Sequence, residues 1–347
     1  MSHYQKPLEL YAGLRLHQNE NTGGCSPRVI EALARLRPDQ IGFYPPYAAA
    51  TEAVAAYLGV STDRIALTNG LDEGIMALAV TFLRAAIGGP QLEAVVPEPA
   101  FEIFRLDTAV AGGMLVQVMP RADFSFPLDE VLAAITPNTR VVFVTNPNNP
   151  TGVGMPLDDI RTIARHLPPD AIVFVDEAYA EFAGVSFIPA LGAFPNVVVG
   201  RTFSKAFGLA GLRIGCLVGA PVTLDPVRRA VPVYSVNVAA VVAVRAALDD
   251  LDYLHDYLRQ VDESKALLYA ACDRLGLAYV KSRSNFVLVR AGEWTDELVK
   301  GAFAKGIYLR DRSTEPGCAG SLRIATGIVQ HTQRAIAVIE EVLCAAR

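Results

Sequence analysis

A lysine, two hydroxyl side chains and an arginine lie close together in residues 196–215, NVVVGRTFSKAFGLAGLRIG. Thr202, Ser204 and Lys205 follow a short apolar run typical of a buried strand, and Arg213 comes shortly after them. The lysine amine can form a Schiff base with an aldehyde, while the hydroxyls and the guanidinium can hold a phosphate. The segment therefore suits a cofactor with both groups, although a strand followed by a polar surface loop explains it equally well.

Polar or aromatic side chains follow three other apolar runs. Asn149 lies in NPNNPTG after one run, Asp176 and Tyr179 lie in DEAY after a second, and Phe101 lies in PEPAF after a third. A pyridine-type cofactor needs a carboxylate at its ring nitrogen, donors at its ring oxygen and an aromatic group on its face. Asp176 fits the first role, Asn149 and Tyr179 the second, and Phe101 the third.

Each of these residues also has a structural interpretation. Asp176 could cap a helix, Tyr179 and Phe101 could be core aromatics, and Asn149 could belong to a turn. Arg213 could be a surface charge. A buried and unpaired aspartate is costly, so Asp176 needs a cationic partner if it lies in the interior.

A further candidate phosphate site lies in the sequence TNGLDEG. It joins an expected strand at 64–68 to an apolar helix expected at 75–83, for which Asp72 is a suitable N-cap. Gly70, Leu71 and Asp72 would place unpaired backbone N–H groups at the positive end of the helix dipole, a geometry that binds phosphate. An ordinary capped turn has the same sequence features.

The elements that position these residues alternate between apolar strands and helical segments, which predicts a mostly parallel sheet with helices on both faces. We expect strands at 64–68, 93–96, 114–119, 140–145, 171–175, 197–199 and 214–218. Ligands of such sheets bind beyond the carboxyl ends of the strands, where the motifs above lie.

The length of 347 residues suits one large and one small domain. After Pro232, long helical segments, short strands and a final helix predict a smaller α+β domain. We expect an N-terminal arm and part of the small domain at 1–40, a large cofactor-binding domain at 41–236 and a small C-terminal domain at 237–347.

The composition argues against several classes of partner. The net charge of -5 and the absence of a Lys/Arg cluster argue against nucleic-acid binding. No apolar run is long enough to span a bilayer and no signal-peptide pattern is present, so we expect a cytoplasmic protein that binds no membrane. The five cysteines and five histidines lack ligand spacing, so we expect no metal site.

The order and separation of NPNNPTG, VDEAY and RTFSKAFGLAGLRIG resemble those of the class I/II aminotransferases of fold type I, which use pyridoxal 5′-phosphate. More narrowly, LHQNEN, TNGLDEGI, GIYLRDR and SLRIATG are similar to motifs of the histidinol-phosphate aminotransferases. The resemblance covers nearly the whole chain. It implies an α/β fold, in which helices sandwich the mostly parallel central sheet of a large domain and a smaller α+β domain follows.

The resemblance implies a role for each matched residue. Lys205, Asp176 and Tyr179 would be catalytic, with Lys205 binding the cofactor and moving the substrate proton and Asp176 pairing with the pyridine nitrogen. Asn149 and Tyr179 would hold the ring oxygen, and Phe101 would stack on the ring. The residues around the cofactor phosphate would be Gly70, Leu71, Asp72, Thr202, Ser204 and Arg213.

Arg310 and Arg323 are the candidates for binding the substrate, since a guanidinium suits a carboxylate or a phosphate. Solvated charges at strand ends are the alternative. The resemblance implies that both contact the substrate anion and that Asn21 and Asn285 lie beside the substrate site. It also implies a homodimer, in which Tyr44 reaches the active site of the neighbouring subunit.

The resemblance implies transamination between a small-molecule amino donor and a keto acid, most specifically histidinol phosphate with 2-oxoglutarate and glutamate. An aromatic amino acid aminotransferase, a lyase of the threonine-phosphate decarboxylase type and a non-catalytic cofactor-sensing module are alternatives. Two departures concern the substrate site: Asn21 precedes Thr22–Gly23–Gly24 where the family usually has proline, and Phe101 replaces the more usual tyrosine.

Overall fold

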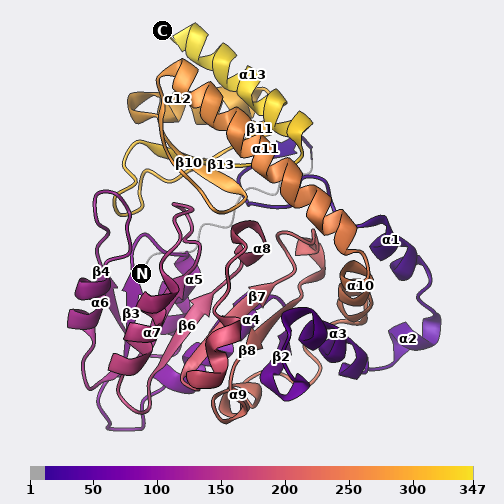
Figure 1. Ribbon diagram of the computed structural model, residues 1–347, viewed down its shortest axis with the longest axis vertical. Coiled ribbons are helices and arrows are strands. Elements are labelled where there is room, and N and C mark those ends of the chain that lie inside the picture. The colour runs from indigo at the N-terminus through magenta and orange to yellow at the C-terminus, as the bar shows by residue number, and fades with distance from the viewer. Residues whose placement is uncertain (1–11, 347) are drawn as a thin grey trace.

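Seven apolar strands form the central sheet of the computed structural model, which describes residues 12–346 (Figure 1). Their order is β2-β8-β7-β6-β5-β3-β4, and only β8 runs against the others. This mostly parallel sheet confirms the predicted fold class. The strands are β2 (Ile65–Thr68), β3 (Glu93–Pro97), β4 (Met114–Val118), β5 (Thr139–Thr145), β6 (Ile172–Asp176), β7 (Val197–Thr202) and β8 (Gly215–Val218).

Both faces of this sheet are covered, and its inner strands are mostly apolar. In β5, Val142 and Val144 face one core, whereas Val141 and Phe143 face the other. The first core is covered by α1 (Pro27–Ala34), α3 (Ala48–Leu58), α6 (Leu128–Ala134), α7 (Leu157–His166) and α10 (Val238–Leu248). The second is covered by α4 (Leu71–Leu83), α5 (Glu102–Val110) and α9 (Pro221–Arg228).

Helix α4 begins earlier than the sequence predicts. Gly70 is its N-cap and Leu71 its first residue, so the prediction that Asp72 caps a helix at 75–83 is wrong. The Glu73 carboxylate accepts a hydrogen bond from the Asn69 backbone N–H at 2.7 Å, which ties the chain before the helix to its first turn. The Asp72 side chain instead pairs with Arg213.

A second, antiparallel sheet of four strands has the order β12-β13-β10-β9 and lies against α11, α12 and α13. The N-terminal strand β1 (Leu14–Arg15) pairs beside it with β11 (Ile307–Tyr308). The other elements are β9 (Ala278–Val280), β10 (Phe286–Arg290), β12 (Arg310–Asp311), β13 (Ser321–Ala325), α11 (Leu251–Leu275), α12 (Thr295–Ala304) and α13 (Val329–Ala346). The short helices are α2 (Pro38–Gly42), α8 (Ala180–Ala183), η1 (Thr62–Arg64), η2 (Ile188–Ala193), η3 (Ala210–Leu212) and η4 (Gly292–Trp294).

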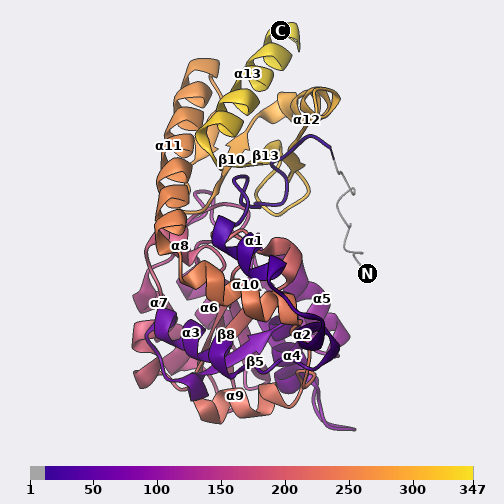
Figure 2. The ribbon, with the colours of Figure 1, turned by 90° about the vertical axis from the view of Figure 1, so that its right-hand side faces the viewer.

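Figure 2 shows α11 extending from the level of α8 to the smaller sheet. Helix α10 packs against α1 and α3 and contributes Ala240 and Val244 to the core of the large sheet. The three-part division of the chain at 40 and 236 remains a prediction.

Two classes of site receive no support from the described residues. Between residues 12 and 346, no helix is long and apolar enough to cross a membrane. Over the same range, no three His, Cys, Asp or Glu side chains are grouped so that they could hold a metal ion.

Candidate active site

A cavity of about 800 Å³ lies where β5, β6 and β7 end, and segments 15–20 and 310–323 form its other walls. It therefore lies at the carboxyl edge of the parallel strands, between the two sheets. Twelve residues that the sequence predicts for the site line this cavity: Leu71, Asp72, Phe101, Asn149, Asp176, Tyr179, Thr202, Ser204, Lys205, Arg213, Arg310 and Arg323.

Three predicted residues lie behind the cavity wall. Gly70 caps α4, and the Arg213 guanidinium lies so close that a Cβ atom there would clash with it. Asn21 donates to the Ala206 carbonyl at 3.0 Å, and Asn285 donates to the Asn19 carbonyl at 3.1 Å. Both asparagines therefore hold backbone segments that line the cavity.

Tyr44 is the predicted residue that lies outside the cavity wall altogether. Its side chain is 74% exposed and stacks on Tyr234, with ring centroids 4.1 Å apart. Ile41, Phe43 and Val233 are exposed beside this pair in the sequence. Contiguous exposed apolar side chains mark interaction surfaces more often than isolated ones do.

Lys205 follows β7 in the turn that leads to Arg213. Its Nζ donates a hydrogen bond to the Gln18 carbonyl at 2.9 Å. Burial, followed by the nearby Arg323 charge, lowers the pKa of Lys205 to about 8. About a tenth of this amine is therefore neutral at pH 7, far more than for an ordinary lysine, and a nucleophile or general base requires this neutral form.

Asp176 ends β6 and is buried. Its Oδ1 accepts a hydrogen bond from the Ala178 N–H at 2.9 Å, and no cation within residues 12–346 forms an ion pair with it. Burial is the largest cause that raises the pKa of Asp176 to about 7. The carboxylate thus faces the cavity without the cationic partner that a buried aspartate needs.

Tyr179 lies next to the Asp176 strand end and packs edge-to-face on Phe286. Asn19 donates to the Tyr179 hydroxyl oxygen at 3.0 Å, so the hydroxyl proton remains available for another acceptor. On the same side, Arg323 donates to Asn149 Oδ1 and, at 2.6 Å, to the His17 carbonyl. These bonds join segments far apart in the sequence.

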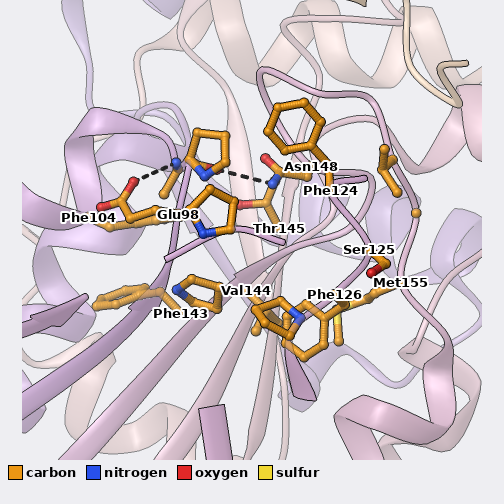
Figure 3. Close-up of a pocket in the computed structure, with 17 residues that line it drawn as sticks. Glu98, Phe104, Phe124, Ser125, Phe126, Phe143, Val144, Thr145, Asn148 and Met155 are labelled. Atoms are coloured by element: carbon orange, nitrogen blue, oxygen red, sulfur yellow. Dashed lines mark hydrogen bonds between the residues drawn. The ribbon is translucent and has the colours of Figure 1, made fainter. Parts of the chain in front are cut away.

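Phe101 is held by the turn that precedes α5. Figure 3 shows the Glu98 carboxylate accepting from the Ala100 N–H and the Asn148 amide donating to the Pro99 carbonyl, at 2.9 and 3.1 Å. The turn is therefore tied to the loop that carries Asn149. The Phe101 ring packs edge-to-face on Phe104, a member of the second core.

The cavity also contains residues that the sequence did not reveal, among them His17, Asn19, Glu102 and Arg312. Arg312 lies two positions after Arg310 in the motif GIYLRDR, so strand alternation could have placed both on one face. Burial and the charges of Arg310, Arg15 and Arg323 lower the pKa of His17 to about 4, so His17 is neutral. His17 and Asn19 lie in the motif LHQNEN, whereas Glu102 gave no comparable signal.

The donors and acceptors in the cavity fit pyridoxal 5′-phosphate. Asp176 has no ion-pair partner within residues 12–346 and could face a protonated pyridine nitrogen, while the lowered pKa of Lys205 makes its neutral amine form accessible. The N-terminus of α4, where Gly70 leaves open the space beside Arg213, offers N–H groups and a guanidinium to a phosphate. The chain thus provides a group for each end of this cofactor.

Known proteins resemble the chain over almost its whole length. Histidinol-phosphate aminotransferases of Symbiobacterium thermophilum and Moorella thermoacetica are 36% and 34% identical to it, over 98% of this chain and 93% and 88% of theirs. The crystal structure of the Sinorhizobium meliloti histidinol-phosphate aminotransferase in complex with pyridoxal-5′-phosphate matches with a TM-score of 0.88. That match has 28% identity and covers 97% of this chain and 92% of that one.

A more distant structure, aspartate aminotransferase from Thermus thermophilus with maleate, shares the fold with a TM-score of 0.78 and 22% identity, over 95% of this chain and 92% of that one. The model of the family "Aminotransferase class I and II" matches residues 12–339. These findings confirm the predictions of an enzyme, of transamination and of pyridoxal 5′-phosphate as its cofactor. The chain belongs to the aminotransferase class I and II family.

Proposed function

We propose that this aminotransferase transfers the amino group of histidinol phosphate to 2-oxoglutarate. The names of the relatives support this substrate, and so does the group of arginines in the cavity that contains Lys205 and Asp176. This group is the observation that carries the proposal, because guanidinium groups recognise phosphate. Phenylalanine or tyrosine would offer these cations only the single charge of its α-carboxylate.

Lys205 is the proposed catalytic base. Pyridoxal 5′-phosphate supplies an aldehyde that takes up the amino group and a ring that withdraws electrons from the substrate α carbon. The Lys205 Nζ would hold the cofactor through its aldehyde and, once displaced by the amino donor, would take the α proton. Its lowered pKa, about 8, keeps the freed amine available as a base.

Asp176 and Tyr179 tune the cofactor ring in this proposal. The Asp176 carboxylate would pair with the pyridine nitrogen and keep it protonated, which would make the ring a better electron acceptor. Tyr179 would donate its hydroxyl proton to the ring oxygen, a direction favoured by the hydrogen bond that it accepts from Asn19. Asn149 would share that oxygen, and Phe101 would cover a face of the ring.

The two ends of the bound molecules are held by different groups. We assign the cofactor phosphate to the α4 N-terminus together with Thr202, Ser204 and Arg213, and the substrate anion to Arg310 and Arg323. The α4 residues involved are Gly70, Leu71 and Asp72. Asn21 and Asn285 position the backbone around the substrate, through the Ala206 and Asn19 carbonyls.

We further propose a homodimer in which Tyr44 reaches the cofactor phosphate of the partner subunit. The exposed stack of Tyr44 on Tyr234 supports this arrangement, because a monomer gains little from exposing a tyrosine pair. The cytoplasmic location and the division into large and small domains predicted from the sequence belong to the same proposal.

Borohydride reduction of the holoenzyme tests the assignment of Lys205. Reduction should attach the cofactor permanently to the peptide that contains Lys205, and Lys205→Ala should abolish turnover. Label on another lysine, or activity that persists in Lys205→Ala, would contradict the assignment.

A second experiment tests the substrate. Glutamate should convert the cofactor from its aldehyde to its amine form, seen as a shift of its absorbance to shorter wavelength, which a lyase or a sensor would not produce. The kcat/KM for histidinol phosphate should then exceed the kcat/KM for phenylalanine and tyrosine. A preference for the aromatic amino acids would sink the proposed substrate.

A further inference from the structure

Three arginines lie on one face of the smaller sheet. Arg310 of β12 and Arg323 of β13 are direct cross-strand partners, and Arg312 follows two residues after Arg310. Side chains at directly opposite positions, and at alternate positions along a strand, share a face. All three line the cavity. Like charges placed directly opposite each other destabilise a sheet, so this arrangement needs an anion.

Among residues 12–346, the anion nearest to Arg310 is Glu102. One oxygen of Glu102 lies 3.9 Å from Arg310 and 3.6 Å from Arg312, and neither guanidinium donates a hydrogen bond to any described residue. Arg312 is nevertheless buried, with only 6% of its side chain exposed. Glu102 is thus a loose partner of both guanidinium groups, whose N–H groups have no hydrogen-bond acceptor within residues 12–346.

Arg312 is held in place from behind by a chain of buried charges. Its guanidinium lies 3.4 Å from Glu315, which accepts a hydrogen bond from Arg105 at 2.9 Å. Arg105 also binds Glu98, the carboxylate seen in Figure 3. This chain joins the small sheet to α5, which begins with Glu102 and follows Phe101. Arg312 is thus held in position by ion pairs, while its guanidinium makes no hydrogen bond to a described residue.

Arg323 shows the effect of this concentration of charge. Burial, followed by the charge of Arg312, lowers the pKa of Arg323 to about 9, and Arg310 contributes in the same direction. Glu102 acts the opposite way but does not balance the cations. An anion bound among the three arginines would remove this penalty.

We propose that Arg312 is a third arginine of the substrate-anion site and that Glu102 competes with the substrate anion for Arg310 and Arg312. The inference rests on the proposed function and deepens it. Three guanidinium groups beside two carboxylates, of which Glu315 is shared with Arg105, favour a dianionic phosphate monoester over a singly charged carboxylate. Arg312 then contributes to the selection of the phosphorylated amino donor.

Inorganic phosphate is the probe, used as a competitive inhibitor of the glutamate half-reaction of the holoenzyme at fixed ionic strength. Arg312→Gln should raise the inhibition constant of phosphate about 10- to 100-fold, as expected for a lost charge-assisted hydrogen bond. Glu102→Gln should lower it about tenfold, because a competing charge is gone. Arg259→Gln, an exposed residue of α11, is the matched control and should leave it unchanged.

Arg312→Gln and Glu102→Gln should change the inhibition constant of phosphate in opposite directions. Damage to the fold would instead weaken phosphate binding in both variants, so the comparison separates this role from a structural one. Arg312→Lys keeps the charge and should retain more phosphate binding than Arg312→Gln, which tests the inference should the glutamine variant be unstable. With histidinol phosphate, Arg312→Gln should raise KM and leave kcat nearly unchanged.

The failures of the inference and of the proposed function are distinguishable. If the wild type does not use histidinol phosphate but the phosphate constants move as expected, the proposed substrate is wrong and the anion site stands. If phosphate does not inhibit the wild type, if Arg312→Gln matches Arg259→Gln, or if Glu102→Gln weakens phosphate binding, the inference is overturned.

Discussion

At the scale of single residues, burial drives two oppositely charged groups towards neutrality. It lowers the pKa of Lys205 to about 8 and raises that of Asp176 to about 7. Neither group finds a full ion pair within residues 12–346. A cofactor with a cationic ring nitrogen and a reactive aldehyde compensates both, so the protein alone holds this site at a cost in stability.

This cost gives a prediction for the apoenzyme. Because the pKa of Asp176 in the folded chain lies above that in the unfolded chain, the folded chain binds this proton more tightly. Stability from this group is therefore present at low pH and is lost as pH rises towards 7. The free energy of unfolding of Asp176→Asn, taken relative to that of the wild type, should rise by roughly 2–3 kcal/mol from pH 5 to pH 8. Urea unfolding at each pH measures it.

Added pyridoxal phosphate provides the control for that experiment. The cofactor should stabilise the wild type more than Asp176→Asn, because only the aspartate carries a charge opposite to that of the ring nitrogen. A stability difference between the two apoproteins that stays constant from pH 5 to 8 would show that Asp176 does not titrate as described.

The sequence predicts residues that follow a strand better than residues that act through a distant partner. Lys205, Asp176 and Asn149 were predictable because parallel strands bring their carboxyl ends to one edge. The role of Asn19 was not, because it depends on Tyr179, which lies 160 residues away. The role of Glu102 likewise depends on Arg310 and Arg312, which are distant in the sequence and which no local pattern connects to it.

At the scale of the elements, apolar runs predicted every strand of the large sheet, and all of its inner strands are largely buried. The start of α4 was missed because Gly70 and Asp72 have the sequence features of a turn and a cap. In the structure, Leu71 is buried in the second core and Asp72 is paired with Arg213, so the helix begins at Leu71. Tertiary contacts therefore decide this boundary.

The turn before α4 gives a prediction with a built-in control. Gly70 has φ +76, and a Cβ there would also clash with the Arg213 guanidinium, whereas Gly59 has φ +68 with open space around it. Gly59→Ala should lose about 1 kcal/mol in denaturant unfolding, because alanine is strained at positive φ. Gly70→Ala should lose more, because its φ of +76 with ψ 164 is a region that is essentially restricted to glycine. Only Gly70→Ala should also weaken cofactor binding, by about tenfold, since it displaces a charge-assisted phosphate donor.

Fluorescence titration of both apoproteins with pyridoxal phosphate would measure that difference. Equal cofactor affinity in Gly70→Ala and Gly59→Ala would contradict the assignment of Arg213 and the α4 N-terminus to the cofactor phosphate. A smaller loss of stability in Gly70→Ala than in Gly59→Ala would mean that the guanidinium moves aside without cost.

At the scale of the molecule, the cavity is built from segments of both sheets. The chain from β1, which pairs with β11 beside the small sheet, runs through His17 to Asn19 and contacts Lys205, Arg323 and Tyr179. The site is therefore complete only when the N-terminal segment and both sheets are assembled. Tyr44 follows this segment but points to solvent, which raises the question of what it contacts.

Mixing two inactive variants answers that question. If Tyr44 serves the partner's site, Tyr44→Ala impairs both sites of its own dimer and Lys205→Ala inactivates both of its own. A mixed dimer has one intact site, formed by Lys205 of the Tyr44→Ala chain and Tyr44 of the Lys205→Ala chain. Co-refolding equal amounts should restore about a quarter of wild-type activity, because half the dimers are mixed and each has one active site.

The oligomeric state must be measured with the activity. Sedimentation should show a dimer for each variant and for the mixture, so that a lack of rescue cannot arise from failed assembly. Tyr234→Ala is the matched variant, because it removes the other ring of the stack, and it should weaken the dimer without supporting rescue by mixing. If the refolded mixture is dimeric and its activity is only the average of the two parents, Tyr44 acts within its own subunit or not at all.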